Sequence, residues 1–468
     1  MRSFGLSVFA LAALAPAGSA SYPPPLIADG PPAPLGYSVT GYAQPTTLPP
    51  FVPPEMRPTG GAMTPGEMGL VPQPGALAWS AQPGGGVPGP DGFAFDPRYG
   101  SPRAGGVNLE YWARGDWLYW ILRHTPVPAL IATGDPNLPN PVIAGQGNFV
   151  PLGAGPRDFG IFNGGRVTVG RWFDEDGELG AELVGFALQR KGDTQVFTDA
   201  TGTPLVSAPV RGLNGVNTSY DFASPGLFTG GLGVSTATQL FGAELSLLHR
   251  WRGSDEECFR INTQVGYRHL QLHEQVNLFG RSQATGGMAT FNGAVLPPGV
   301  TVSTSDSFRG RTEFHGAIIG AQAAGFHNNL SLTAFAKVGA GINLQVMRVD
   351  GSTTATGPGA TQTTFGGVRA LPSNFGRDTN TDFSMVGEFG IELAYHLTRR
   401  ISVRGGYNLL FWSDVLRPGN AIDPVVNFTQ VPIDPTFGQS GGAARPVNVF
   451  RSSDFLAQGL VVGLQLDY

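Results

Sequence analysis

Residues 330–346 read LSLTAFAKVGAGINLQV, and apolar side chains occupy every second position of this stretch. Successive side chains of a β-strand point to opposite faces, so the pattern predicts a strand with one apolar and one polar face. Phe335 is the one bulky residue on the polar face. Strands of soluble proteins typically have about 5–6 residues. This longer run therefore favours a strand that crosses a membrane, with lipid on one side and a polar interior on the other.

The same alternation returns in residues 389–397 and 401–411. Short turns are expected at residues 174–177, 253–256, 327–329 and 398–400, and long irregular connections at 123–163, 191–238, 279–307, 350–382 and 413–454. This arrangement predicts an all-β fold, an antiparallel transmembrane β-barrel of about ten strands with both chain ends on the periplasmic side. The expected strand starts lie near Leu109, Gly165, Leu179, Gln239, Phe259, Phe308, Leu330, Phe383, Ile401 and Phe455. A further hairpin within residues 191–238 would raise the number to about twelve.

Three segments follow one another along the chain. Residues 1–20 have the features of a cleaved signal peptide: Arg2, then an apolar stretch over residues 4–14, then Gly18-Ser19-Ala20 before the expected cleavage. Residues 21–106 are rich in Pro and Gly and should form a disordered periplasmic linker, because such a segment buries too little apolar surface to offset its ordering entropy. Residues 107–468 should form the outer-membrane barrel.

Composition and spacing argue against several kinds of site. The formal net charge is −5 and no run of Lys or Arg occurs, so we expect no nucleic-acid partner. A single cysteine, Cys258, excludes an intramolecular disulfide and a multi-cysteine zinc site. His269 and His273 would lie about 13 Å apart on one strand face, too far to share a metal ion. We therefore expect no metal, no cofactor and no catalytic residues, and predict that the protein is not an enzyme.

The polar face of the predicted strands carries charges of both signs. Projected inward, the alternation places eleven charged side chains in the lumen: Arg166, Glu182, Glu244, Arg260, Arg268, Arg311, Glu313, Lys337, Glu388, Glu392 and Arg404. Because the signs nearly balance, acid and base can pair across a narrow interior. This favours a structural plug over a selectivity filter, which usually has a bias of one sign. The aromatic side chains of Trp112, Trp117, Tyr119, Trp120 and Trp412 are expected in girdles at the membrane interfaces.

The last strand ends on an aromatic residue. Leu460, Val462, Leu464, Leu466 and Tyr468 share one face, and Gly463, Gln465 and Asp467 the other. A terminal aromatic on an alternating strand resembles the signal by which the barrel assembly machinery recognises its clients. We expect that machinery and outer-membrane lipid to be the partners of this chain.

Several short motifs follow one another in a specific order along the chain. They are Trp117-Leu118-Tyr119-Trp120, residues 130–134 (LIATG), residues 164–170 (GGRVTVG), Leu371-Pro372-Ser373-Asn374, Gly406-Tyr407-Asn408, Phe411-Trp412-Ser413, Arg417-Pro418-Gly419 and residues 453–460 (SDFLAQGL). Taken together in this order, they resemble the beta-barrel porin-7 family of outer-membrane proteins. The resemblance runs from about residue 116 to residue 468. It implies an outer-membrane barrel and brings no catalytic role with it.

Taken together, the sequence predicts an outer-membrane barrel, porin-like with a narrow or plugged lumen, or a structural component of the envelope. The alternative is a secreted surface adhesion or scaffold β-protein. A soluble monomer of that kind should not expose Leu, Val, Ile and Phe along one side of successive strands. The sequence predicts no particular oligomeric state.

Overall fold

A computed structural model describes residues 111–468, apart from residues 136, 138–148, 175–176, 202–203 and 252–258. The predicted signal peptide, the predicted linker, the predicted turn at residues 253–256 and Cys258 lie outside the described residues.

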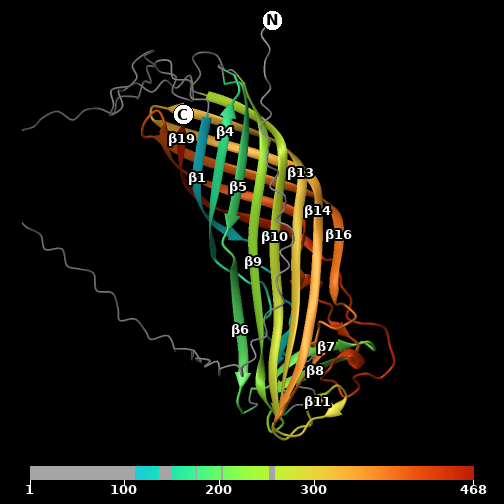
Figure 1. The fold of residues 1–468 in the computed structure, drawn as a ribbon. Helices are drawn as coiled ribbons and strands as arrows, with labels where there is room; N and C mark the ends of the chain where they lie inside the picture. Colours follow the sequence, from blue (N-terminus) through green and yellow to red (C-terminus); the bar gives the residue numbers. More distant parts are fainter. Residues whose placement is uncertain (1–110, 136, 138–148, 175–176, 202–203, 252–258) are drawn as a thin grey trace, which may run out of the picture. The chain divides into compact units, whose positions relative to one another are not determined.

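Within the described residues, ten antiparallel strands form a closed ring (Figure 1). Around the ring the order is β10, β13, β14, β16, β17, β19, β1, β4, β5 and β9, and β9 pairs with β10 to close it. In chain order the strands are β1 (Tyr111–Leu122), β4 (Ile161–Trp172), β5 (Leu179–Leu188), β9 (Phe228–Trp251), β10 (Phe259–Ala284), β13 (Thr301–His327), β14 (Leu330–Gly357), β16 (Gly376–His396), β17 (Ile401–Leu416) and β19 (Ser452–Asp467). The prediction of an all-β barrel with about ten strands is confirmed.

The alternative of about twelve strands is wrong, because the described part of residues 191–238 adds no strand to the ring besides the beginning of β9. Strand β6 (Lys191–Asp199) continues along the edge of β9 where β5 ends: β5 pairs with β9 from His249 to Phe241, and β6 pairs with it from Thr238 to Gly230. The following hairpin, β7 (Val206–Gly212) with β8 (Asn217–Ala223), belongs to a separate sheet.

An apolar band covers the outside of the barrel. On β14, Leu332, Val338 and Ile342 are exposed, while Thr333 and Asn343 on the opposite face are buried. Neighbouring strands present outward Leu, Val, Ile and aromatic side chains at the same level. The predicted alternation therefore places apolar side chains outside the barrel and polar ones inside it, as a bilayer requires.

Beyond this band, strands β9, β10, β13 and β14 continue at the long-loop end as one sheet, and the polarity of its two faces reverses. Phe308, Val276 and Leu278 now face inward and are buried. Arg311 and His273, which are opposite each other in the register of β13 with β10, lie on the outer face. Strand β6 and strand β15 (Ala360–Phe365) extend the two edges of this sheet. The reversed pattern is that of a sheet with one face on a hydrophobic core and the other in water.

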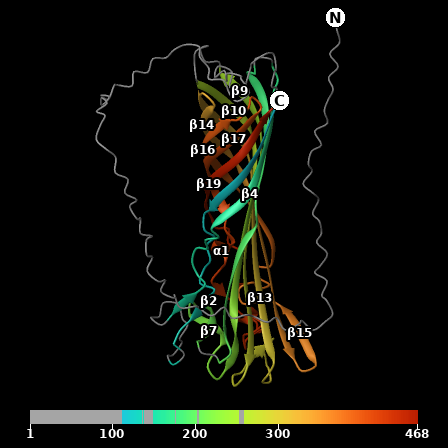
Figure 2. The ribbon, with the colours of Figure 1, turned by 90° about the vertical axis from the view of Figure 1, so that its left-hand side faces the viewer.

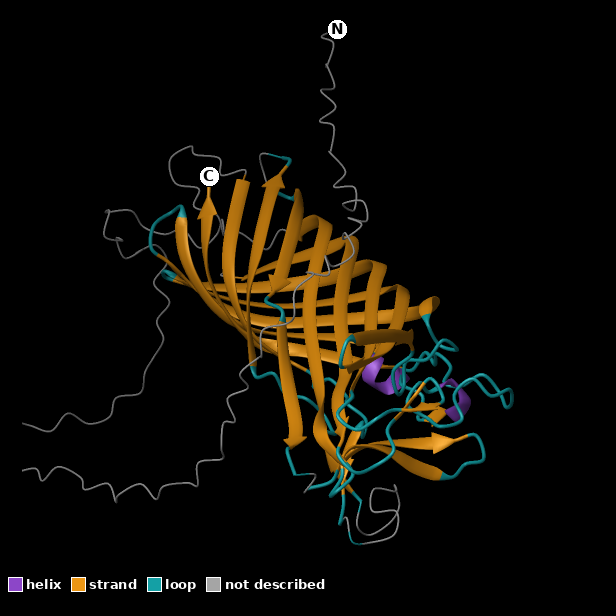
Figure 3. Ribbon diagram, turned by 60° about the horizontal axis from the view of Figure 1, so that its bottom comes forward, coloured by secondary structure: helices purple, strands orange, loops and turns teal. Residues whose placement is uncertain are grey.

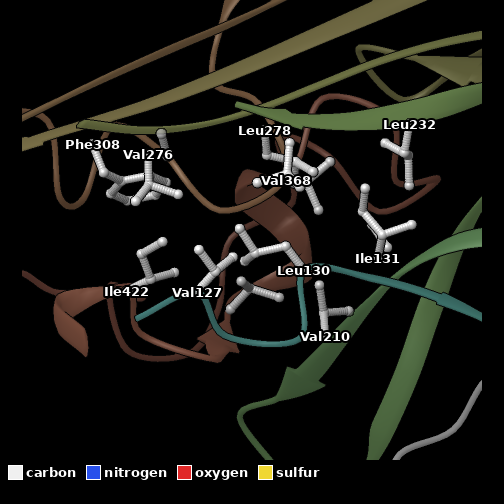
Figure 4. Close-up of a cluster of buried hydrophobic side chains, with 14 of the residues drawn as sticks. Val127, Leu130, Ile131, Val210, Leu232, Val276, Leu278, Phe308, Val368 and Ile422 are labelled. Atoms are coloured by element: carbon white, nitrogen blue, oxygen red, sulfur yellow. The ribbon is translucent and has the colours of Figure 1, made fainter. Parts of the chain in front are cut away.

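That core is completed by irregular segments, which we call the mouth insert: residues 123–135, 149–160, 205–224, 366–375 and 417–450. The insert contains β2 (Ile131–Thr133), β3 (Val150–Leu152), β7, β8, β18 (Val425–Val426), the short helix α1 (Pro418–Ala421) and the 3₁₀ helix η2 (Phe428–Gln430) (Figures 2 and 3). A two-stranded ladder, β11 (Thr290–Phe291) with β12 (Ala294–Val295), lies in a neighbouring loop. Figure 4 shows Val127, Leu130, Val210, Val368 and Ile422 packed toward Phe308, Val276 and Leu278 of the extended sheet.

No helix among the described residues is long and apolar enough to span a membrane.

Strand β19, the last ring strand in chain order, pairs with β1, the first. Tyr111 and Tyr468 exchange two backbone hydrogen bonds of 2.9 Å, and their rings stack with centroids 5.6 Å apart. The other members of the predicted assembly signal, Leu460, Val462, Leu464 and Leu466, are exposed on the outer face.

Replacing Tyr468 with Asp is expected to reduce barrel insertion strongly, because it removes the aromatic end of the closing strand and places a charge on the lipid face. Membrane fractionation and heat-modifiable gel mobility measure the inserted fraction. Tyr468→Phe keeps the ring and should insert normally. Equal insertion of the Asp variant would contradict the assignment of Tyr468 to the assembly signal.

Candidate functional site

The charged side chains of the barrel interior form the first candidate site. Nine of the eleven side chains predicted to line the lumen lie on the inward face of their strands: Arg166, Glu182, Glu244, Arg260, Arg268, Lys337, Glu388, Glu392 and Arg404. Arg311 and Glu313 do not. They lie on the outer face of β13, 3.4 Å apart, while their neighbours Thr312 and Phe314 are buried. The prediction failed there because the polarity of β13 reverses above the apolar band.

One cluster forms around Glu244. Lys337 Nζ lies 2.8 Å from Glu244 Oε1, and Arg268 Nε donates to Glu244 Oε2 at 2.9 Å. Arg268 also pairs with Glu388. Gln264 donates a further bond to the Glu244 carboxylate at 3.0 Å. Buried charges persist only when they are paired and hydrogen-bonded, and each member of this cluster meets that condition.

A second cluster reaches across the lumen. Arg166 on β4 donates to Asp116 on β1 at 2.8 Å and lies 3.4 Å from Glu392 on β16. Glu392 also pairs with Arg404 on β17, whose guanidinium donates to Gln465 at 2.6 Å. Four steps around the ring separate β4 from β16, so the Arg166–Glu392 pair joins nearly opposite walls.

Two members of this network were missed by the sequence reasoning. Asp116 is buried and Arg114 approaches Glu182 to 4.0 Å. The alternation on β1 could have identified both residues, because they lie on the same face of the strand as Trp112 and Trp120. The sequence predicts those two indoles, and that of Trp412, in the interface girdles. The structure corrects this: Trp112, Trp120 and Trp412 are buried inside, whereas Trp117 and Tyr119 are exposed outside. A narrow barrel needs large inward side chains to fill it.

Arg260 differs from the other lumen cations. Among the described residues it has no ion-pair partner, and its guanidinium lies 5.0 Å from the ring centre of Phe326. Its Nε and Nη1 atoms are buried without a hydrogen-bond partner.

The space left between the clusters is small. A cavity of about 60 Å³ lies among Arg114, Arg166, Arg268, Lys337, Glu388 and Glu392. Such a volume holds a few water molecules.

A buried ion pair anchors the mouth insert to the barrel wall. Arg417 donates to Glu274 on β10 through Nε at 2.6 Å and Nη2 at 2.9 Å, and both side chains are 1% exposed. Thr125 Oγ1 donates to the same carboxylate at 2.8 Å, and Arg417 Nη2 also donates to the backbone oxygen of His124. Sequence analysis singled out Arg417 only within the Arg417-Pro418-Gly419 stretch, because its partner is 143 residues away.

A second anchor holds the 366–375 segment. Asp306 Oδ1 accepts hydrogen bonds from the backbone N–H groups of Val368, Arg369 and Ala370 at 3.0, 2.9 and 2.6 Å. Asp306 lies on β13, nine residues from His315 toward the long-loop end of the strand, and is therefore well outside the apolar band. Its side chain is fully buried. Burial raises its pKa to about 6, although the three N–H groups act in the opposite direction.

His269 and His273, whose spacing on one strand is too wide for a shared metal ion, lie on the outer face of β10. The His269 ring packs on His315 with centroids 4.7 Å apart, and Nδ1 of His315 is 2.6 Å from the Tyr267 hydroxyl. Within the part of the chain that the structure describes, no group of three or more His, Cys, Asp and Glu side chains could hold a metal ion.

Comparison with known proteins identifies a family. Residues 112–468 match the family described as Putative beta barrel porin-7. No curated protein sequence matches the chain. Among solved structures, the outer membrane protease OmpT from Escherichia coli is similar with 10% identity and a TM-score of 0.34, over 77% of this chain and 98% of that one. A Pseudomonas aeruginosa FadL homologue is similar with 9% identity and a TM-score of 0.20, over 77% and 90% of the two chains.

Proposed function

This chain belongs to the Putative beta barrel porin-7 family, and from that premise we propose that it is a porin-like barrel whose lumen is nearly closed. Its place is the outer membrane. The observation that carries the proposal is the Arg166–Glu392 pair, which bridges almost the full width of the lumen. Side chains that meet in the middle of a ten-stranded ring leave little room for solute, since barrels of about eight strands are filled by their own side chains.

The mouth insert supports the same conclusion. Its hydrophobic core packs on the inward face of the extended sheet, and Arg417 and Asp306 anchor it there. A solute entering from the long-loop end would have to pass this insert before it reached the charge clusters. Passage would therefore be restricted at two successive levels.

We also propose that the protein has no catalytic role. The lumen carboxylates and guanidinium groups are engaged mainly with one another, and this pairing stabilises the interior.

Outer-membrane lipid would contact the apolar band, and the assembly machinery would recognise β19. Export would require the predicted signal peptide at residues 1–20. The alternative of a secreted adhesion or scaffold protein is not favoured, because that band would then face water.

Planar-bilayer recording of the purified protein tests the proposal. We expect a conductance far below that of a general porin of about 16–18 strands. Arg404→Ala should raise this conductance several-fold, because it removes a side chain from the lumen and takes away one of the two cationic partners of Glu392. Arg311→Ala is the matched control, because that guanidinium lies outside the wall, and it should change nothing. Heat-modifiable mobility confirms that each variant is folded.

A large, stable conductance of the unmodified protein would overturn the proposal. So would an equal rise in conductance for both arginine variants, since only one of them lines the lumen.

A further inference from the structure

A second cavity, of about 370 Å³, lies at the long-loop end beyond the charge clusters. Strand β8 and η2 of the mouth insert form part of its wall, and the start of β9 forms another part. Its lining includes four aromatic rings and two carboxylates: Tyr220, Phe222, Phe228, Phe428, Asp221 and Asp434. The volume falls in the range of small-molecule sites, roughly 300–1,000 Å³, which are mostly apolar with a few placed polar groups.

The two carboxylates are hydrogen-bonded only to neutral groups. Asp221 accepts a bond of 2.6 Å from Ser207 Oγ, and Asp434 accepts one of 2.8 Å from the Tyr220 hydroxyl and another of 2.6 Å from Thr436 Oγ1. Among the described residues, neither has a Lys, Arg or His nitrogen within 4.0 Å. Elsewhere in this protein, by contrast, the buried carboxylates Glu244, Glu274 and Glu392 each have a cationic partner.

Burial at this site acts on the two titratable side chains of β8. It raises the pKa of Asp221 and that of the Tyr220 hydroxyl, whose partner Asp434 raises it further. Both residues lie in the mouth insert, outside the apolar band. A partly buried carboxylate that lacks a counter-charge gains free energy when a cation reaches it, because the cation offsets the cost of desolvation.

The aromatic side chains favour the same kind of ligand. Tyr220 and Phe428 meet edge to face, with centroids 6.4 Å apart and an interplanar angle of 89°. Aromatic faces attract ammonium groups and also cover apolar carbon. All the residues that line the cavity belong to the described part of the chain, and none of them is Lys, Arg or His. The cavity therefore offers negative charge beside apolar surface, with nothing to repel a cation.

We propose that this cavity binds a small organic cation: an ammonium group held by Asp221, Asp434 or both, joined to an apolar body that lies against the rings. The site would be reached from the long-loop side, so it does not depend on whether the barrel conducts. A neutral sugar is the other ligand that rings and hydroxyl groups could accept. The unpaired carboxylates favour the cation.

Calorimetry on the full-length barrel in detergent tests the proposal with three probes: phenethylammonium, the neutral 2-phenylethanol and glucose. We expect phenethylammonium to bind at least about tenfold more tightly than the alcohol, since only the amine can form a charge-assisted hydrogen bond with a carboxylate. Glucose should not bind. Because these measurements use the unmodified protein, they do not depend on the folding of any variant.

Variants then locate the site. At least one of Asp221→Asn and Asp434→Asn should weaken phenethylammonium binding about tenfold, and the double variant should weaken it by at least as much. Asp350→Asn is the control, since that aspartate pairs with Arg309 on the outer surface, and it should bind normally. Equal binding of the amine and the alcohol, glucose binding in place of the amine, or unchanged binding by the double variant would each overturn the proposal.

Discussion

Glu274→Ala is expected to lower the free energy of unfolding by about 3–5 kcal/mol, the usual cost of removing one member of a buried ion pair. The loss is large because Arg417 would remain 1% exposed with its charge uncompensated. Thr125 would lose the acceptor of its hydroxyl at the same time. Urea unfolding in detergent micelles, followed by tryptophan fluorescence, measures the change.

An exposed pair provides the control. Arg309 and Asp350 pair on the outer surface, where both side chains are 45% exposed, so Asp350→Ala should cost less than about 1 kcal/mol. The double variant Glu274→Leu with Arg417→Met should recover most of the lost stability, because no buried charge is then left alone. A Glu274→Ala protein as stable as the unmodified one would show that this pair does not anchor the insert.

The strand starts show where sequence reasoning succeeds. Starts after the short turns were predicted at Leu179, Phe259, Leu330 and Ile401, and the structure begins strands at these residues. Starts after long loops were predicted too late: β9 begins at Phe228 where Gln239 was expected, and β16 at Gly376 where Phe383 was expected. An apolar-out pattern marks only the length of strand that faces lipid. Beyond the bilayer the same strand is polar outside, and the pattern no longer signals it.

The residues of the candidate site were also predicted better inside the apolar band than beyond it. Inside the apolar band the two-residue period is a strong guide, because a charged side chain on the wrong face of a strand would lie in lipid. Nine of the inward charges there were predicted, and Arg114 and Asp116 on β1 were missed. The sequence predicts only long irregular connections where the mouth insert lies. Its order depends on contacts between distant residues, such as Arg417 with Glu274 and Asp306 with the 368–370 backbone. Local periodicity carries no information about such pairs.

Asp306→Ala is expected to detach the 366–375 segment and to lower the free energy of unfolding by about 3 kcal/mol or more, since each buried N–H left without an acceptor costs roughly 1–3 kcal/mol. The N–H groups of Val368, Arg369 and Ala370 all lose their acceptor. Hydrogen exchange at these three amides should accelerate sharply, and urea unfolding gives the change in stability. Asp306→Asn retains Oδ1 as an acceptor and should leave exchange slow. Fast exchange in both variants would assign the effect to charge and not to the hydrogen bonds.

The Asn variant also isolates the titration of this carboxyl group. Burial raises the pKa of Asp306 from 3.8 to about 6, so the folded protein binds this proton more tightly than the unfolded chain does. The stability gained from that proton is fully present below about pH 4 and is lost as the pH rises through about 6. Asp306→Asn cannot titrate. The difference in unfolding free energy, unmodified protein minus Asn variant, should therefore fall between about pH 4 and 6 and stay constant at higher pH. A difference that rises with pH below about pH 4 and levels off above it would mean that the three N–H groups outweigh burial and hold the pKa of Asp306 below its ordinary value.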